Sequence, residues 1–131
     1  MGAPNHPRTV ILCVDDEETA LEVRKRVLEM AGYRVLTATS ASQALEIFRN
    51  NHVDLVLTEH IEPAALGAGT LAAAMKMLKP EVSIAIYSSD WKESPGDMRF
   101  ADIFITKLVT IDELLRTIQE LLAKSSPRTA A

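Results

Sequence analysis

The sequence predicts a single α/β domain built on a parallel, doubly wound sheet. Short apolar segments alternate with amphipathic ones five times along the chain. The first apolar run, residues 9–14, is continuous and rich in β-branched residues, as in a central strand that is buried on both faces. The 131 residues suffice for one hydrophobic core but not for two ordinary ones.

The first helix is predicted over residues 17–31, where apolar side chains recur at helical spacing. These apolar positions are Ala20, Val23, Val27 and Ala31. Gly32 follows, at the place of a C-terminal cap. Residues 33–39 indicate the second strand.

The second helix begins with a capping-box signature, Ser40 followed by Gln43, and is expected to reach residue 50. Its apolar face consists of Ala41, Ala44, Leu45 and Phe48. Residues 53–58 indicate the third strand, and a third helix over residues 67–79 ends at Pro80.

The last part of the chain predicts strands over residues 82–88 and 103–106 and a helix that Thr110 and Glu113 open as a second capping box. The apolar residues of this helix are Ile111, Leu114, Leu115, Ile118, Leu121 and Leu122. Residues 89–101 contain Pro, Gly and Asp and few apolar residues, so we expect a loop or a shortened fourth helix there. Because parallel neighbours require crossover connections, the alternation predicts helices on both faces of the sheet.

Composition excludes several classes of protein. The net charge of −4 and pI near 5.3 argue against a nucleic-acid partner. No apolar stretch approaches the roughly 20 residues of a membrane helix, and residues 1–8 lack the apolar core of a signal peptide. A cytoplasmic domain over residues 9–124 is therefore expected, between tails at 1–8 and 125–131, as a monomer or weak homodimer. The single cysteine, Cys13, is expected to be an inert buried thiol.

Chemically active side chains follow four of the predicted strands. Asp15 and Asp16 follow the first strand, Glu59 the third, Ser88 ends the fourth and Lys107 follows the fifth. Ligands of open parallel sheets bind outside the carboxyl ends of the strands. Acids before a helix also cap it, which would explain the acid pair alone but not the coincidence at four strand ends. The sequence therefore predicts an acidic pocket at this edge.

The charge of this pocket favours a hard divalent cation. Three carboxylates against one ammonium leave about two negative charges, which would raise pKa values or recruit a metal ion. Carboxylates with water suit Mg²⁺, whereas Zn²⁺ would require His or Cys ligands. His60 is the only nearby histidine, and we interpret it as a surface neighbour in a turn.

With these residues in place, residues 9–124 resemble the receiver domain of two-component response regulators. The likeness is carried by Ile-Leu-Cys-Val-Asp-Asp-Glu at 11–17, by Asp-Leu-Val-Leu-Thr-Glu at 54–59, by Pro63 and Gly67 in the following loop, by Ser88 and by Lys107. The resemblance implies a flavodoxin-like (βα)5 sandwich with strand order 2-1-3-4-5.

The resemblance also implies roles. In the family, the acid pair binds Mg²⁺ and an aspartate accepts a phosphoryl group from a histidine kinase. The hydroxyl and the lysine bind the phosphoryl oxygens, so these roles would fall on Ser88 and Lys107. Phe104 matches an aromatic switch residue that turns inward on activation.

Two departures from the family pattern bear on function. Glu59 occupies the phosphoacceptor position, and its carboxylate reaches about 1.5 Å further than that of an aspartate. It would be misaligned for in-line transfer, yet could contact Ser88 or Lys107 and imitate the phosphorylated state. Leu108 replaces a proline with a cis peptide bond, so a trans bond and a displaced Lys107 are expected.

Three hypotheses follow from these residues. The preferred one is a non-enzymatic, atypical receiver in two-component (phosphorelay) signalling that acts by contact with a histidine kinase or downstream effector. The second is a working Mg²⁺-dependent phosphoacceptor, in which Asp54 could not replace Glu59 because it lies at the opposite end of its strand. The third, a metal-dependent phosphohydrolase, is the weakest because the sequence offers no second nucleophile or general base.

Overall fold

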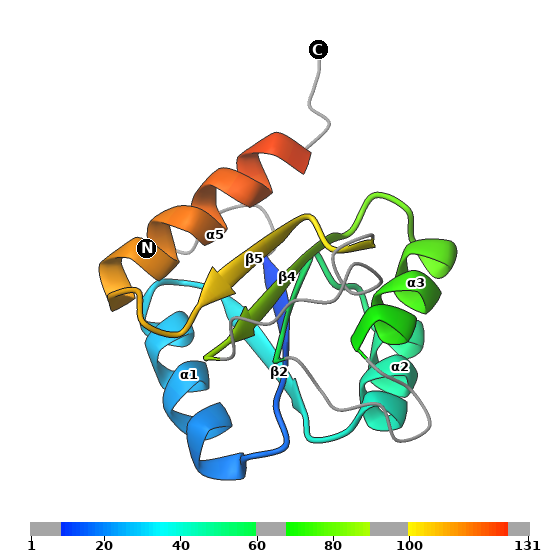
Figure 1. The fold of residues 1–131 in the computed structure, drawn as a ribbon, viewed down its shortest axis with the longest axis horizontal. Coiled ribbons are helices and arrows are strands. Elements are labelled where there is room, and N and C mark those ends of the chain that lie inside the picture. Colours follow the sequence, from blue (N-terminus) through cyan, green and yellow to red (C-terminus); the bar gives the residue numbers. More distant parts are fainter. Residues whose placement is uncertain (1–8, 60–67, 90–99, 126–131) are drawn as a thin grey trace, which may run out of the picture.

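The computed structural model describes residues 9–59, 68–89 and 100–125. These residues form a parallel sheet of five strands with helices on both faces (Figure 1). The strands are β1 (Val10–Val14), β2 (Arg34–Ala38), β3 (Leu55–Thr58), β4 (Ser83–Ser88) and β5 (Ile103–Thr106). The helices are α1 (Glu18–Met30), α2 (Ala41–Asn50), α3 (Ala68–Leu78) and α5 (Ile111–Ser125). The strand order β2-β1-β3-β4-β5 confirms the predicted topology.

Helices α1 and α5 cover one face of the sheet, and α2 and α3 cover the other (Figure 1). Each predicted strand and each of these four helices is present, with bounds that differ from the prediction by two residues or fewer. The predicted irregular crossover falls mainly on residues 90–99, which lie outside the described part of the chain.

The turn after α1 depends on Gly32, as predicted. Its φ of +103° lies in the left-handed region, where a side chain is strained. The Gly32 N–H donates to Glu29 O and the Tyr33 N–H to Leu28 O, at 2.9 and 3.2 Å. These two bonds form a Schellman cap that leads the chain directly into β2.

Of the two predicted capping boxes, the second forms completely and the first only in part. The Gln43 N–H donates to Ser40 Oγ at 3.1 Å, although the Gln43 side chain bonds the Thr39 N–H and not that of Ser40. In the second box both bonds are made: the Glu113 N–H donates to Thr110 Oγ1 and the Thr110 N–H to Glu113 Oε1. These side chains satisfy N–H groups that would otherwise lack partners at the helix starts.

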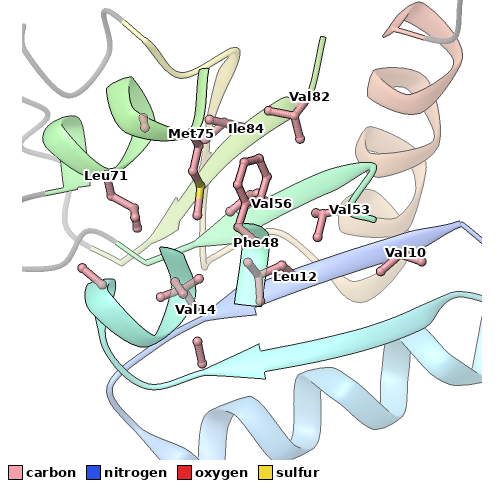
Figure 2. Close-up of a cluster of buried hydrophobic side chains, with 14 residues drawn as sticks. Val10, Leu12, Val14, Phe48, Val53, Val56, Leu71, Met75, Val82 and Ile84 are labelled. Carbon is pink, nitrogen blue, oxygen red and sulfur yellow. The ribbon is translucent and has the colours of Figure 1, made fainter. Parts of the chain in front are cut away.

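The strand residues alternate between two hydrophobic cores. We call the first the α2–α3 core; Leu12 of β1, Phe48 of α2 and Met75 of α3 belong to it (Figure 2). We call the second the α1–α5 core; Cys13 of β1 and Ile118 of α5 belong to it. Successive strand residues point to opposite faces, so the continuous apolar run of β1 supplies both cores.

Cys13 is fully buried, and burial raises the pKa of its thiol to about 12, in agreement with the predicted inert role. In α5, Leu114 and Ile118 are buried as predicted, whereas Ile111 is 55% exposed and does not belong to the core. Among the described residues, no helix is both long and apolar enough to cross a membrane.

Candidate functional site

The candidate site lies at the carboxyl ends of β1, β3, β4 and β5. At three of these ends the parallel hydrogen-bond pattern continues one residue beyond the strand. The bonds run from the Asp15 N–H to Ala38 O (3.1 Å), from the Glu59 N–H to Val14 O (2.8 Å) and from the Lys107 N–H to Ser88 O (3.0 Å). The sheet therefore fixes the backbone of Asp15, Glu59 and Lys107, and the site is built on rigid elements.

Lys107 joins two of the predicted acids. Its Nζ donates to Glu59 Oε1 at 2.8 Å and to Asp15 Oδ2 at 3.0 Å. Asp15 is only 1% exposed, and its Oδ1 accepts the Glu17 N–H at 2.9 Å. Lys107 therefore points into the pocket despite the trans bond before Leu108, and the predicted contact between Glu59 and Lys107 is confirmed.

A second cation enters the site from α1, and the sequence interpretation missed it. Arg24 Nη2 donates to Asp15 Oδ2 at 3.3 Å, and Arg24 is 9% exposed. The Arg24 guanidinium also lies over the Tyr87 ring, 4.9 Å from its centroid. Asp15 thus has two cationic partners, where the sequence predicted one.

The position of Arg24 corrects the predicted face of α1. The buried residues of this helix are Leu21, Arg24 and Leu28, whereas Val23 is 58% exposed. The periodicity of the smaller apolar side chains therefore predicted the wrong face. The larger leucines are buried instead, and Asp15 supplies the charge that lets an arginine lie between them. The spacing of Leu21 and Leu28 around Arg24 was the available signal.

The close packing of these charges shifts their pKa values. Burial raises the pKa of Asp15, but the bonds that its carboxylate accepts lower it, to about 2. The neighbours that lower the pKa of Asp15 are, in order, Glu59, the Glu17 N–H and Lys107, and the last two donate hydrogen bonds to the Asp15 carboxylate. Burial and Asp15 together raise the pKa of Glu59. Burial lowers the pKa of Lys107, yet the two carboxylates outweigh it and the net shift is upward. Asp15 therefore holds its charge, and Glu59 is the first of the pair to take a proton.

The predicted metal-binding acids come together. Asp15, Asp16 and Glu59 each present an oxygen within 4.8 Å of the other two. Asp16 is exposed, Glu59 is half-buried and Asp15 is buried. All-oxygen ligands suit Mg²⁺. In ligand type the cluster fits the ion, but Arg24 reduces the negative charge that was expected to attract it.

The remaining predicted residues lie around this cluster. Ser88 is 2% exposed at the end of β4, and Phe104 is half-buried on β5, in register with Ile86. Leu108 is 81% exposed, and no peptide bond in the described segments is cis, as expected for the leucine. His60, Pro63 and Gly67 lie outside the described residues.

Comparisons with known proteins agree with this fold. The response regulator receiver domain family matches residues 11–119. A CheY-like receiver domain protein from Methanospirillum hungatei superimposes with a TM-score of 0.82 at 27% identity, over 91% of this chain and 97% of that one. TrrA from Thermotoga maritima, solved in complex with Mg²⁺-BeF, gives a TM-score of 0.79 at 28% identity, over 86% and 98% of the two chains.

Two curated relatives are longer than this chain. The transcriptional regulatory protein YvrH of Bacillus subtilis is 32% identical over 121 residues, which are 88% of this chain and 49% of YvrH. The autoinducer 1 sensor kinase/phosphatase LuxN of Vibrio harveyi is 27% identical over 128 residues, 96% of this chain and 15% of LuxN. The likeness therefore covers a half or less of these two relatives.

Proposed function

Since the chain belongs to the response regulator receiver domain family, we propose that it is an atypical receiver of two-component signal transduction that signals by protein contact, without conventional aspartate phosphorylation. One observation carries the proposal. Glu59 stands directly after β3, where the family's phosphoacceptor aspartate is expected, and its carboxylate is bonded to Lys107 at 2.8 Å.

This bond gives Glu59 a different role from that of an acceptor. Lys107 stands where the family has the lysine that binds a phosphoryl oxygen, and here it already binds two carboxylates. To accept a phosphoryl group, Glu59 would have to break its ion pair with Lys107. Its carboxylate also reaches about 1.5 Å further than that of an aspartate at the same position. Since alignment and charge stabilisation supply most of the catalysis of phosphoryl transfer, we expect transfer to be slow. The Glu59–Lys107 bond would instead hold one signalling conformation.

We propose a histidine kinase or a downstream effector as the protein partner of the domain over residues 9–124, in the cytoplasm. Two observations support the choice: one relative is a sensor kinase/phosphatase and the other a transcriptional regulatory protein. Signalling by protein contact would require no catalytic activity of this domain. Any Mg²⁺ at the pocket would be held by carboxylate oxygens of Asp15, Asp16 and Glu59.

The test uses a small phosphodonor. The native protein, Glu59→Asp and the control Glu46→Asp are each mixed with Mg²⁺ and acetyl phosphate. Glu46 is exposed on α2, so Glu46→Asp makes the same substitution at a position outside the pocket. We expect no mass gain and no donor-dependent NMR shifts for the native protein and for Glu46→Asp. Glu59→Asp is expected to gain one phosphoryl group.

The other outcomes separate the competing functions. A phosphoryl group on the native protein would establish a working phosphoacceptor and refute our proposal. Steady release of phosphate would instead indicate a phosphohydrolase. If Glu59→Asp also stays unmodified, Lys107 and Leu108 would be implicated, and the pocket would be inactive for more than one reason.

A further inference from the structure

We propose that Arg24 is a built-in counter-cation of the acidic pocket, which takes over the charge-balancing role of a divalent metal ion and makes the domain independent of Mg²⁺. The inference rests on the proposed function only for the identity of the pocket. It concerns what the pocket binds and does not depend on whether Glu59 accepts a phosphoryl group.

The burial of Arg24 is the first observation. Its side chain is 9% exposed in the middle of the buried face of α1. Its Nη1 is buried and has no hydrogen-bond partner within the described part of the chain. A buried donor without a partner is unfavourable, and a leucine or methionine would fill the same space without that cost. Packing alone therefore does not explain an arginine here, whereas the charge of Asp15 does.

The acceptor capacity of Asp15 is the second observation. Its Oδ1 accepts the Glu17 N–H, and its Oδ2 accepts both Arg24 at 3.3 Å and Lys107 at 3.0 Å. An ionised carboxylate offers about four lone-pair positions, so three of them are in use. A metal ion on Oδ2 would approach two cations already bonded to that oxygen, and like charges at such distances repel strongly.

The charge count is the third observation. Asp15, Asp16 and Glu59 face Arg24 and Lys107, so three carboxylates meet two cations. The single formal negative charge that remains attracts a divalent ion far less than the two expected without Arg24.

The experiment measures metal binding directly, without any phosphodonor. Mg²⁺ is titrated by NMR into the native protein, Arg24→Met and the control Arg26→Met, and Mn²⁺ broadening locates the site. Arg26 is exposed on the same helix, so Arg26→Met also removes one positive charge, but at a position outside the pocket. We expect Arg24→Met to bind Mg²⁺ about ten- to hundredfold more tightly than the native protein, with Mn²⁺ broadening centred on Asp16.

Two further measurements guard against a variant that fails to fold. Arg24→Gln keeps a donor for Asp15 but removes the charge, and it is expected to show the same gain in affinity. The native protein itself is expected to unfold at the same temperature in Mg²⁺ and in EDTA. Saturable Mg²⁺ binding that is equally tight in the native protein and in either Arg24 variant would overturn the proposal, and so would an equal gain in Arg26→Met.

Discussion

The two faces of the sheet are built on the same helical spacing but hold different chemistry. On one face, α2 buries Ala41, Ala44 and Phe48. On the other, α1 buries residues with the same separations of three and four: Leu21, Arg24 and Leu28. The middle position is an alanine on the first face and an arginine on the second. The buried face of α1 thus includes a charged residue of the candidate site, whereas the buried residues of α2 are all apolar.

The strands do not cause this difference, since β1 sends apolar side chains to both faces. The cause lies at the end of β1, where Asp15 is buried close to α1. Arg24 reaches it from the first turns of the helix and rests on the Tyr87 ring. The ion pair between Asp15 and Arg24 thus connects the candidate site to the buried face of α1.

The first and largest prediction concerns the apolar face. Phe48→Ala removes a fully buried ring from the α2–α3 core (Figure 2). We expect it to lower the free energy of unfolding by about 3–5 kcal/mol, through lost burial and the cavity left behind. Denaturant unfolding measures the loss, with Phe48→Leu as the milder control. The amide NMR signals of Asp15 and Lys107 should stay in place; large shifts there would show that the two faces are coupled.

The second prediction concerns the face that carries charge. Asp15→Asn removes the carboxylate that Arg24 and Lys107 share, and we expect a loss of about 2–3 kcal/mol near neutral pH. The pKa of Asp15 is lowered from 3.8 to about 2, so its stabilisation is present above pH 3.8 and is lost as the pH falls through about 2. Denaturant unfolding of both proteins between pH 6 and pH 2 measures the difference.

Glu59 titrates in the opposite sense and must be removed from this comparison. Its raised pKa favours the folded state when it is protonated, so its contribution grows as the pH falls. The pair Glu59→Gln and Asp15→Asn/Glu59→Gln isolates Asp15. The Glu17 N–H and Lys107 still lower the pKa of Asp15 in this pair, so a stability difference that is the same at pH 6 and at pH 2 would contradict that part of the shift.

The α2–α3 face was largely predictable from the sequence, and the α1–α5 face was not. Helix α2 has a small, clean apolar face and a local cap, so periodicity and the Ser40–Gln43 signal suffice to locate it. In α1, periodicity selected Val23, which is exposed, because an arginine in a helix is normally assigned to solvent. Its burial depends on Asp15, nine residues earlier, and the tertiary contact between them carries no periodic signal.

The candidate site was also predictable only in part: the sequence indicated which residues meet, but not which bonds they make. The topology of a parallel sheet brings residues at strand ends together, which is why Asp15, Glu59 and Lys107 were found without a structure. Their detailed partners were not predictable. The sequence indicated that Glu59 could reach Ser88 or Lys107, and only the side-chain geometry shows the 2.8 Å bond to Lys107.

The last and smallest prediction also separates the pocket from the rest of the fold. Lys107→Met removes the bonds to Glu59 and Asp15, and because Arg24 still balances Asp15 we expect a loss of only about 1–2 kcal/mol near pH 7. The two carboxylates raise the pKa of Lys107 above its ordinary 10.5, so its stabilisation is complete below pH 10.5 and is lost as the pH rises through the higher, folded value. The stability difference from the native protein should therefore be constant from pH 7 to pH 10 and shrink above pH 10.5.

Tyr33, whose pKa burial raises, titrates in both proteins and cancels from the difference. Lys124→Met, an exposed lysine of α5, is the control and should show no such pH dependence. A difference that stays constant through strongly alkaline pH would mean that Lys107 stabilises the fold by packing and not by its charge.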